Sequence, residues 1–204
     1  MIINNLAFVI GDLIWRVQPD LLIELGTSGG GSAWYWAHIM SGYNTQAKVL
    51  TMDPASGGLT GTPLKSWNGP SVRNFCPHCD HPTSRPEWRE MVRYVRSVPA
   101  SDEAIEIARA AAAEATVVMV IEDSIHLENV VYENLKAYAG FVTPDSYFIV
   151  QDTRLGGPAK ALDRFLAEPG GADRFERDTS AQYYTYSQHI GGFLRRAPST
   201  PLSA

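Results

Sequence analysis

The feature that most constrains this chain is the alternation of short apolar runs with stretches of helical periodicity. Apolar runs at 21–25, 48–53, 116–121 and 147–150 are each followed by a glycine, a proline or a polar side chain. Such runs are typical of strands buried on both faces, and helical stretches between them make consecutive strands parallel. The pattern therefore predicts a mostly parallel sheet that helices cover on both faces.

Further segments complete this prediction. Residues 91–98 fit another strand, and the tail 175–194 alternates as a closing antiparallel hairpin would. Helices are expected between the strands, at 32–40 with an N-cap near Ser32, at 102–115 with Ser101 as N-cap, at 128–139 and at 158–166. We thus predict an α/β fold with a doubly wound, mostly parallel seven-stranded sheet and a C-terminal antiparallel hairpin.

Length and composition narrow the class of protein. With 204 residues, 45% of them hydrophobic, the chain suits a single globular domain over 1–204, in which the Gly-, Pro-, Ser- and Thr-rich segment at about 55–86 is an irregular insertion. A net charge of −5 argues against nucleic acid as a partner. No apolar run approaches the roughly 20 residues of a membrane span. The start also lacks the basic residues of a signal peptide, so we expect a cytoplasmic protein without a membrane partner.

A glycine-rich loop, Glu24-Leu25-Gly26-Thr27-Ser28-Gly29-Gly30-Gly31, follows the first predicted strand. Ligands of open α/β sheets bind beyond the carboxyl ends of the strands, where glycines let the backbone approach a ligand closely. Asp53, which ends the second strand, is placed to accept hydrogen bonds from ribose hydroxyls. The glycine spacing differs from the G-x-G-x-x-G of dinucleotide-binding loops. It resembles the acid-x-Gly-x-x-x-Gly loop of enzymes that bind S-adenosylmethionine, with NAD binding and a plain strand-to-helix turn as the alternatives.

Polar side chains follow the fourth and fifth predicted strands. Asp123 and His126 come after one, and Gln151 and Asp152 come directly after the other. Side chains at neighbouring strand ends can converge on one ion, and oxygen ligands suit Mg²⁺. His126 is placed to act as a general base, because the unperturbed pKa of histidine is about 6.5. In the alternative interpretation the acids cap the following helices and the histidine is structural.

The run Cys76-Pro77-His78-Cys79-Asp80-His81 gathers two thiols and two imidazoles. Cys76, Cys79 and His81, with a ligand from elsewhere in the chain, would suit zinc, although structural zinc sites normally draw on two separated pairs of ligands. A labile disulfide and two reduced thiols are the alternatives, and reduced thiols are favoured.

Together these motifs resemble those of the cephalosporin hydroxylase family. The shared pattern is Glu-x-Gly-Thr-x-x-Gly-Gly-Ser-Ala, then Asp-x-x-His after a strand, then (Glu/Gln)-Asp-Thr after the next, and the likeness spans about 19–196 apart from the insertion. The family has the class I S-adenosylmethionine-dependent methyltransferase fold, which is Rossmann-like, and looks related to the macrolide-sugar O-methyltransferases. The resemblance implies a metal-assisted O-methyltransferase that acts on a hydroxyl of a small natural product or a sugar.

The resemblance also implies roles for single residues. Cofactor contacts would come from Glu24, Gly26, Thr27 and Ser32 to the methionine part, from Asp53 to the ribose, and from Ser101 and Asp102 to the adenine. The metal ligands would be Asp123, Gln151 and Asp152, with Mg²⁺ as the ion and His126 as the general base.

Two departures from the family pattern keep other functions open. Gln151 stands where the family commonly has a glutamate, so the metal site carries one charge fewer. The region before the first strand is short, so either the insertion or a neighbouring subunit of a homo-oligomer is expected to enclose the substrate. An iron enzyme of hydroxylase type that uses Asp123, His126 and Asp152, and a catalytically silent cofactor-binding subunit, are the other candidates.

Overall fold

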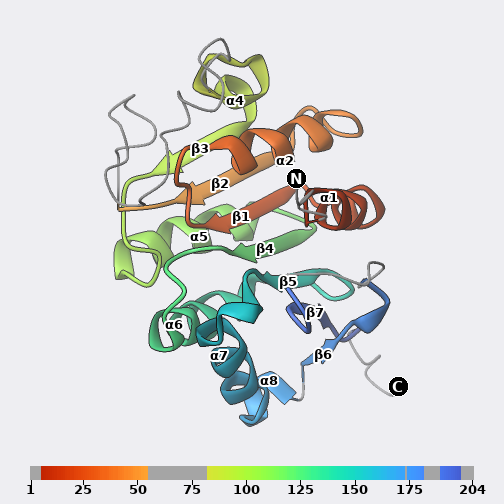
Figure 1. Ribbon diagram of the computed structural model, residues 1–204. Coiled ribbons are helices and arrows are strands. Elements are labelled where there is room, and N and C mark those ends of the chain that lie inside the picture. The colour runs from red at the N-terminus through yellow and green to blue at the C-terminus, as the bar shows by residue number, and fades with distance from the viewer. Residues whose placement is uncertain (1–5, 55–81, 173, 182–188, 199–204) are drawn as a thin grey trace, which may run out of the picture.

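The computed structural model describes residues 6–54, 82–172, 174–181 and 189–198, and it shows one twisted sheet between two layers of helices (Figure 1). The strands are β1 (Leu21–Leu25), β2 (Lys48–Met52), β3 (Val92–Val95), β4 (Val118–Glu122), β5 (Tyr147–Val150), β6 (Phe175–Arg177) and β7 (Phe193–Arg196). Their order in the sheet is β3-β2-β1-β4-β5-β7-β6. Strands β1 to β5 pair in parallel, whereas β7 runs antiparallel to both β5 and β6.

The helices form two layers. They are α1 (Leu6–Val17), α2 (Gly31–Ser41), α4 (Pro86–Met91), α5 (Asp102–Glu114), α6 (Glu128–Tyr138), α7 (Gly157–Leu166) and α8 (Pro169–Ala172), with short 3₁₀ turns η1 (Pro82–Ser84), η2 (Ala139–Phe141), η3 (Thr153–Leu155) and η4 (Thr179–Ala181). One hydrophobic cluster joins the sheet to α5, α6 and α7, and a second joins its other face to α1, α2 and α4.

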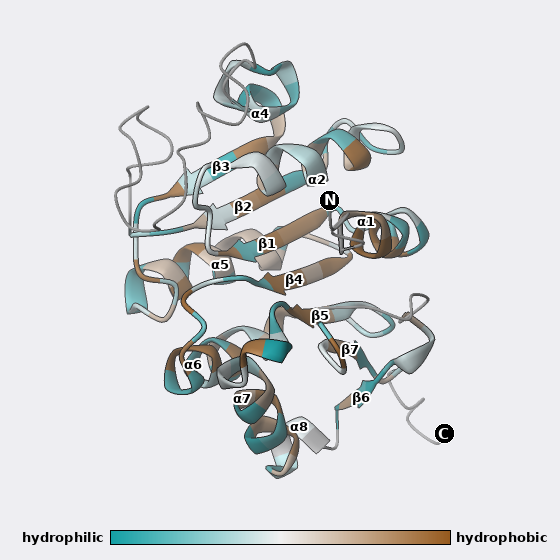
Figure 2. Cartoon of the chain, in the orientation of Figure 1, coloured by the Kyte–Doolittle hydropathy of each residue, from teal (hydrophilic) through white to brown (hydrophobic). Residues whose placement is uncertain are grey.

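The two-sided burial explains the sequence pattern. In β1, Leu22 packs on the side of α1 and α2, whereas its neighbour Ile23 packs on the side of α5 and α6. The central strands β1 and β4 therefore carry apolar residues at nearly every position, which Figure 2 shows as brown arrows in the middle of the sheet. The predicted α/β fold class, with a seven-stranded sheet and antiparallel C-terminal strands, is confirmed.

Some predicted boundaries are wrong. The strand expected at 116–121 lies at Val118–Glu122, because the Asp20 carboxylate accepts hydrogen bonds from the backbone N–H groups of Thr116 and Val117 and holds them in a turn. The strand expected at 91–98 is limited to Val92–Val95, since Pro86–Met91 forms α4 directly before it.

The two predicted N-caps differ in outcome. Ser101 caps α5 as expected, with its hydroxyl accepting a hydrogen bond of 3.2 Å from the backbone N–H of Ala104. Ser32 does not cap α2, which begins at Gly31 after an N-cap residue, Gly30, with φ of 75°. The Ser32 hydroxyl hydrogen-bonds to the Glu24 carboxylate instead.

The N-terminal helix α1 was not among the expected elements. Asp12 interrupts its apolar run in the sequence, but it lies on the outer face and pairs with Arg16 one turn later at 3.1 Å. Ile10 and Ile14 occupy the inner face and are fully buried. The helix therefore extends the apolar cover of one face of the sheet (Figure 2).

The C-terminal part also differs from a simple hairpin. β6 and β7 pair as expected, but η4 and further chain separate them, and β7 lies between β5 and β6. Most of the predicted insertion, residues 55–81, lies outside the described residues. Over the residues that are described, no helix is both long and apolar enough to cross a membrane.

Candidate functional site

The chemistry predicted from the sequence gathers at one edge of the sheet. The loops after β1, β2, β4 and β5 all leave the carboxyl ends of parallel, hydrogen-bonded neighbours. Successive strands extend one way from β1 to β3 and the other way from β4 to β5, so the topology reverses between β1 and β4. Crevices at such reversals are where open α/β sheets bind ligands.

Glu24 lies beneath the glycine loop, with 0% of its surface exposed. One carboxylate oxygen accepts a hydrogen bond of 2.6 Å from the Thr51 hydroxyl, and the other accepts one of 3.1 Å from the Trp36 indole N–H. Burial raises the pKa of this carboxyl to about 7, against the opposing effect of its hydrogen bonds. Glu24 was expected to line the cofactor pocket. Its side chain points into the protein and ties β1 to β2 and α2, and its contact with the cofactor stays a prediction.

The Asp53 carboxylate binds the same loop from its outer side through hydrogen bonds. Its Oδ2 accepts hydrogen bonds from the backbone N–H groups of Thr27 at 3.1 Å and Ser28 at 2.9 Å. Beneath them the Thr27 hydroxyl lies 2.7 Å from that of Thr51. The carboxylate therefore lies at the rim of the loop, where the sequence placed the contact with a ribose, while its charge also orders two loop amides.

Gly26 brings the first loop against the loop after β4. Its φ is 106°, and a Cβ at this position would lie 2.1 Å from the carbonyl oxygen of Asp123. Only glycine fits both the conformation and the space. The expected cofactor loop and the expected metal ligand are thus in direct backbone contact.

Ser101 and Asp102 lie at the start of α5, beyond β3. The Ser101 hydroxyl is 2.9 Å from that of Ser97 and caps the helix, and Asp102 is exposed in its first turn. Both positions border the same edge of the sheet as Asp53, because the backbone N–H of Asp53 donates to the carbonyl of Val95 at the end of β3. Their contact with an adenine stays a prediction.

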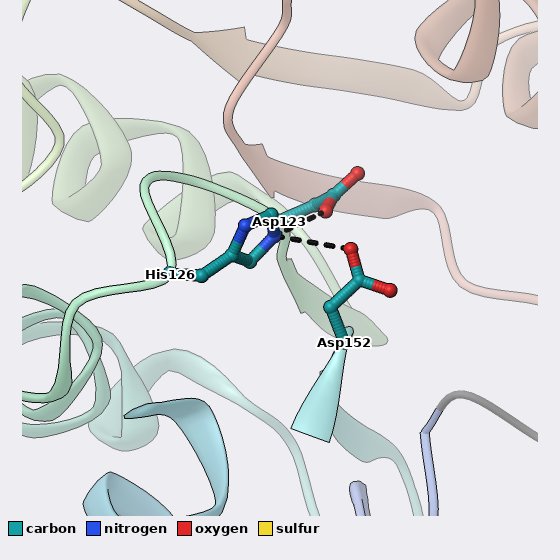
Figure 3. A group of neighbouring side chains, drawn as sticks. All are labelled: Asp123, His126 and Asp152. Carbon is teal, nitrogen blue, oxygen red and sulfur yellow. Dashed lines mark ion pairs between the residues drawn. The ribbon is translucent and has the colours of Figure 1, made fainter. Parts of the chain in front are cut away.

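Asp123, His126 and Asp152 converge where β4 and β5 end (Figure 3). His126 Nε2 lies 3.1 Å from Asp152 Oδ2 and 3.6 Å from Asp123 Oδ1. One ligand atom from each of the three residues lies within 4.8 Å of the others. Between 22% and 33% of each side chain is exposed, so a small ligand can reach the cluster.

The charges in this cluster are unevenly matched. Burial and the nearby charge of Asp152 raise the pKa of Asp123. The neighbouring carboxylate of Asp123, together with that of Asp152, raises the pKa of His126. Among the described residues no lysine or arginine forms an ion pair with either carboxylate. Two carboxylates that share one imidazole are a donor set that fits a hard divalent cation.

Gln151 is only 4% exposed, and its backbone N–H donates to the carbonyl of Glu122 at 2.9 Å. Gln151 directly precedes Asp152. The backbone φ of Asp152 is 50°, which lies in the left-handed region. The predicted metal ligands Asp123 and Asp152 are therefore brought together, and the coordination by Gln151 stays a prediction.

Two functional neighbours were missed in the sequence. His189 is 2% exposed, and its Nδ1 accepts a hydrogen bond of 2.6 Å from the backbone N–H of Asp152. Burial lowers the pKa of His189 to about 4. Glu122 is fully buried at the end of β4, accepts hydrogen bonds from Ser124 and Asn134, and has its pKa raised to about 7 by burial. His189 has no distinctive spacing, whereas an acid ending the apolar run of β4 was a usable signal for Glu122.

The predicted zinc ligands Cys76, Cys79 and His81 lie outside the described residues, and zinc binding there stays a prediction.

Comparisons with known proteins agree with this geometry. A profile of the family described as Rhamnosyl O-methyltransferase/CmcI matches residues 5–58 and 77–197. A rhamnosyl O-methyltransferase of Mycobacterium leprae is 25% identical over 174 residues, which are 84% of this chain and 65% of that protein. One of Mycobacterium tuberculosis is 29% identical over 148 residues, which are 72% of this chain and 51% of that protein. This chain thus spans between half and two thirds of the length of these relatives.

A solved structure supports the same fold. CmcI with Mg and SAM superposes with a TM-score of 0.62 and 18% identity, over 93% of this chain and 70% of that one. Because the family profile also covers most of the sequence, including every described residue of the site, the chain belongs to the Rhamnosyl O-methyltransferase/CmcI family.

Proposed function

We propose that this chain is an S-adenosylmethionine-dependent O-methyltransferase that methylates a hydroxyl of a sugar or another small molecule with the help of a divalent metal ion. The observation that carries the proposal is the backbone contact between Gly26 of the glycine loop and Asp123 of the acidic cluster. A methyl donor held by the loop would lie beside an acceptor held by the cluster. The names of the family relatives support this class of reaction.

The cofactor would occupy the crevice above β1 and β2. Ser28 and Asp53 form its rim, since Ser28 is exposed and the Asp53 carboxylate lies above the loop. Glu24 and Thr51, joined by a hydrogen bond of 2.6 Å, support the loop from beneath. This arrangement provides a carboxylate for the ribose hydroxyls without a phosphate cradle.

Methyl transfer needs an acceptor oxygen in line with the sulfonium carbon and a base for its proton. His126 Nε2 is the base, and the carboxylates of Asp123 and Asp152, 3.6 Å and 3.1 Å from it, stabilise the imidazolium once Nε2 has taken the proton. The C–S bond breaks as the C–O bond forms, the proton goes to Nε2, and the products are S-adenosylhomocysteine and a methyl ether. When bound by Asp123 and Asp152, Mg²⁺ would lower the pKa of the acceptor hydroxyl and fix its position.

The surface around the cluster points to an acceptor with an apolar part. Ile125 and Leu127 flank His126 in the sequence, Leu155 lies three residues after Asp152, and Ile190 follows His189; each of the four side chains is between 58% and 60% exposed. Exposed apolar side chains that lie close to a polar centre can contribute to a binding surface. A sugar hydroxyl at His126, with an apolar substituent over these residues, fits that surface.

Calorimetry with S-adenosylhomocysteine, with and without Mg²⁺, tests the proposal. We expect micromolar binding that does not require the ion, followed by ion-dependent methylation when rhamnose-containing acceptors and S-adenosylmethionine are supplied. Absence of binding would refute the methyltransferase assignment. Oxygen-dependent turnover with bound iron would favour the hydroxylase-type alternative.

A further inference from the structure

We propose that His189 is a positioning residue that holds Asp152 in the conformation that directs its carboxylate at His126. The inference deepens the proposed function and rests on it for its link to catalysis. It adds a residue that lies outside the Asp-x-x-His and Gln-Asp-Thr motifs and more than 35 positions beyond them.

The backbone at Asp152 needs such support. Its φ of 50° and ψ of 35° place it in the left-handed region, which a residue with a side chain adopts only with backbone strain. A residue in this region turns the chain sharply between β5 and η3. Relaxation to an extended conformation would swing the carboxylate away from His126, whose Nε2 now lies 3.1 Å from it.

His189 stabilises this turn directly. The backbone N–H of Asp152 donates to Nδ1 of His189 at 2.6 Å, so that nitrogen must carry a lone pair. The ring is 2% exposed, and its Nδ1 also lies 3.9 Å from Asp152 Oδ1. The imidazole therefore contacts both the amide and the carboxylate of the same residue.

The segment that carries His189 is fastened to the end of β5. The Thr153 hydroxyl donates to the carbonyl of Ile190 at 3.0 Å, and the backbone N–H of Val150 donates to the carbonyl of Gly192 at 2.8 Å. A Cβ on Gly192 would lie 2.1 Å from the Val150 carbonyl oxygen, so this close approach requires glycine. These contacts therefore fix the position of the His189 imidazole relative to Asp152.

Three substitutions separate the hydrogen bond from simple packing. In H189N the amide oxygen stands where Nδ1 stood and can accept from the Asp152 N–H, whereas H189Q places its oxygen near the position of Nε2. H189L fills the space and accepts nothing. H38N, at an exposed histidine that pairs with Glu87 on α4, is the matched control.

Two measurements on the full chain provide the test. Amide exchange followed by NMR should show faster exchange of the Asp152 N–H in H189L and H189Q, and near-wild-type protection in H189N. Titration with Mn²⁺, followed by electron paramagnetic resonance, should show about 10- to 100-fold weaker binding in H189L, rescued in H189N, with S-adenosylhomocysteine affinity unchanged throughout. H38N should match the wild type in both measurements.

The outcomes distinguish this inference from the proposed function. Unchanged Asp152 exchange in a folded H189L protein, or Mn²⁺ binding that H189N fails to restore, overturns the role of His189. If wild-type protein binds neither Mn²⁺ nor S-adenosylhomocysteine, the proposed function fails, and the exchange of the Asp152 amide alone then decides whether His189 fixes this turn.

Discussion

The edge of the sheet where ligands are expected to bind has two halves, the first after β1 and β2 and the second after β4 and β5. The carboxylates of the two halves differ in the partners that the chain supplies to them. After β1 and β2, Glu24 and Asp53 are supplied with donors by the chain itself, from Thr51, Trp36 and the loop amides. After β4 and β5, Asp123 and Asp152 share one imidazole, and no other cation pairs with them in the described ranges.

This difference separates structural support from chemistry. An acid whose lone pairs are already occupied shapes the loop in which it lies. Acids that outnumber their partners can accept a metal ion, a substrate proton or both. We therefore expect substitutions in the first half to alter cofactor affinity and folding, and substitutions in the second half to alter the rate of methyl transfer.

The largest effect is expected at the base. H126A should lower the rate of methyl transfer by about 10² to 10⁴-fold, because an imidazole is ordinarily a stronger base than the carboxylates beside it. Affinity for S-adenosylhomocysteine, measured by calorimetry, should stay within about twofold of wild type, since His126 belongs to the second half. A comparable loss of cofactor affinity would show that the two halves are not separate in function.

A substitution at Gly26 should disturb both halves of this edge together, the glycine loop in the first and the cluster of Asp123, His126 and Asp152 in the second. G26A places a Cβ 2.1 Å from the Asp123 carbonyl at a φ of 106°, so we expect a loss of roughly 2 to 4 kcal/mol in the free energy of unfolding. Urea denaturation measures this loss. G31A is the matched control in the same loop, because its Cβ would meet nothing within 4 Å. Equal stability of the two variants would contradict the close contact.

Asp53 should affect the first half alone. D53N removes the charge that orders the amides of Thr27 and Ser28, and we expect about tenfold weaker binding of S-adenosylhomocysteine, or about 1.4 kcal/mol. The rate at saturating S-adenosylmethionine should change little. A large fall in that rate with unchanged affinity would place Asp53 in the second half.

Buried Glu24 and Glu122 allow a comparison by pH. The pKa of each is about 7 in the folded protein against 4.5 ordinarily. Between these values the folded state holds more protons than the unfolded chain, so the free energy of unfolding should fall as pH rises from about 4.5 to 7 and then level off. Each group contributes on the order of 3 kcal/mol to this fall.

The variants E24Q and E122Q should each remove about half of that pH dependence, as measured by urea denaturation at pH 5, 6, 7 and 8. E106Q, at a glutamate whose side chain is 74% exposed, is the control and should keep the wild-type curve. Parallel curves for wild type and both buried variants would show that neither glutamate takes up a proton on folding.

Much of the fold could be read from local pattern. Strands such as Leu21–Leu25 and Tyr147–Val150 were predicted with their observed bounds, because burial on both faces demands continuous apolar runs. The motifs around Asp123, His126 and Asp152 were also predicted to converge, because parallel neighbouring strands end at the same edge. Helix α1 was not predicted, because the charged residue Asp12 on its outer face interrupts the apolar run in the sequence. The apolar stripe on its inner face is nevertheless continuous.

The sequence by itself determined the order of elements, the cofactor loop and the acids at the strand ends, since each depends on residues close together in the chain. Only the tertiary structure decided which acids are supplied with partners. Glu24 turns inward because Thr51 and Trp36 approach from β2 and α2, and His189 reaches Asp152 across 37 positions through the pairing of β7 with β5. Hydrogen bonds between distant segments depend on how the strands pack, and no local pattern encodes them.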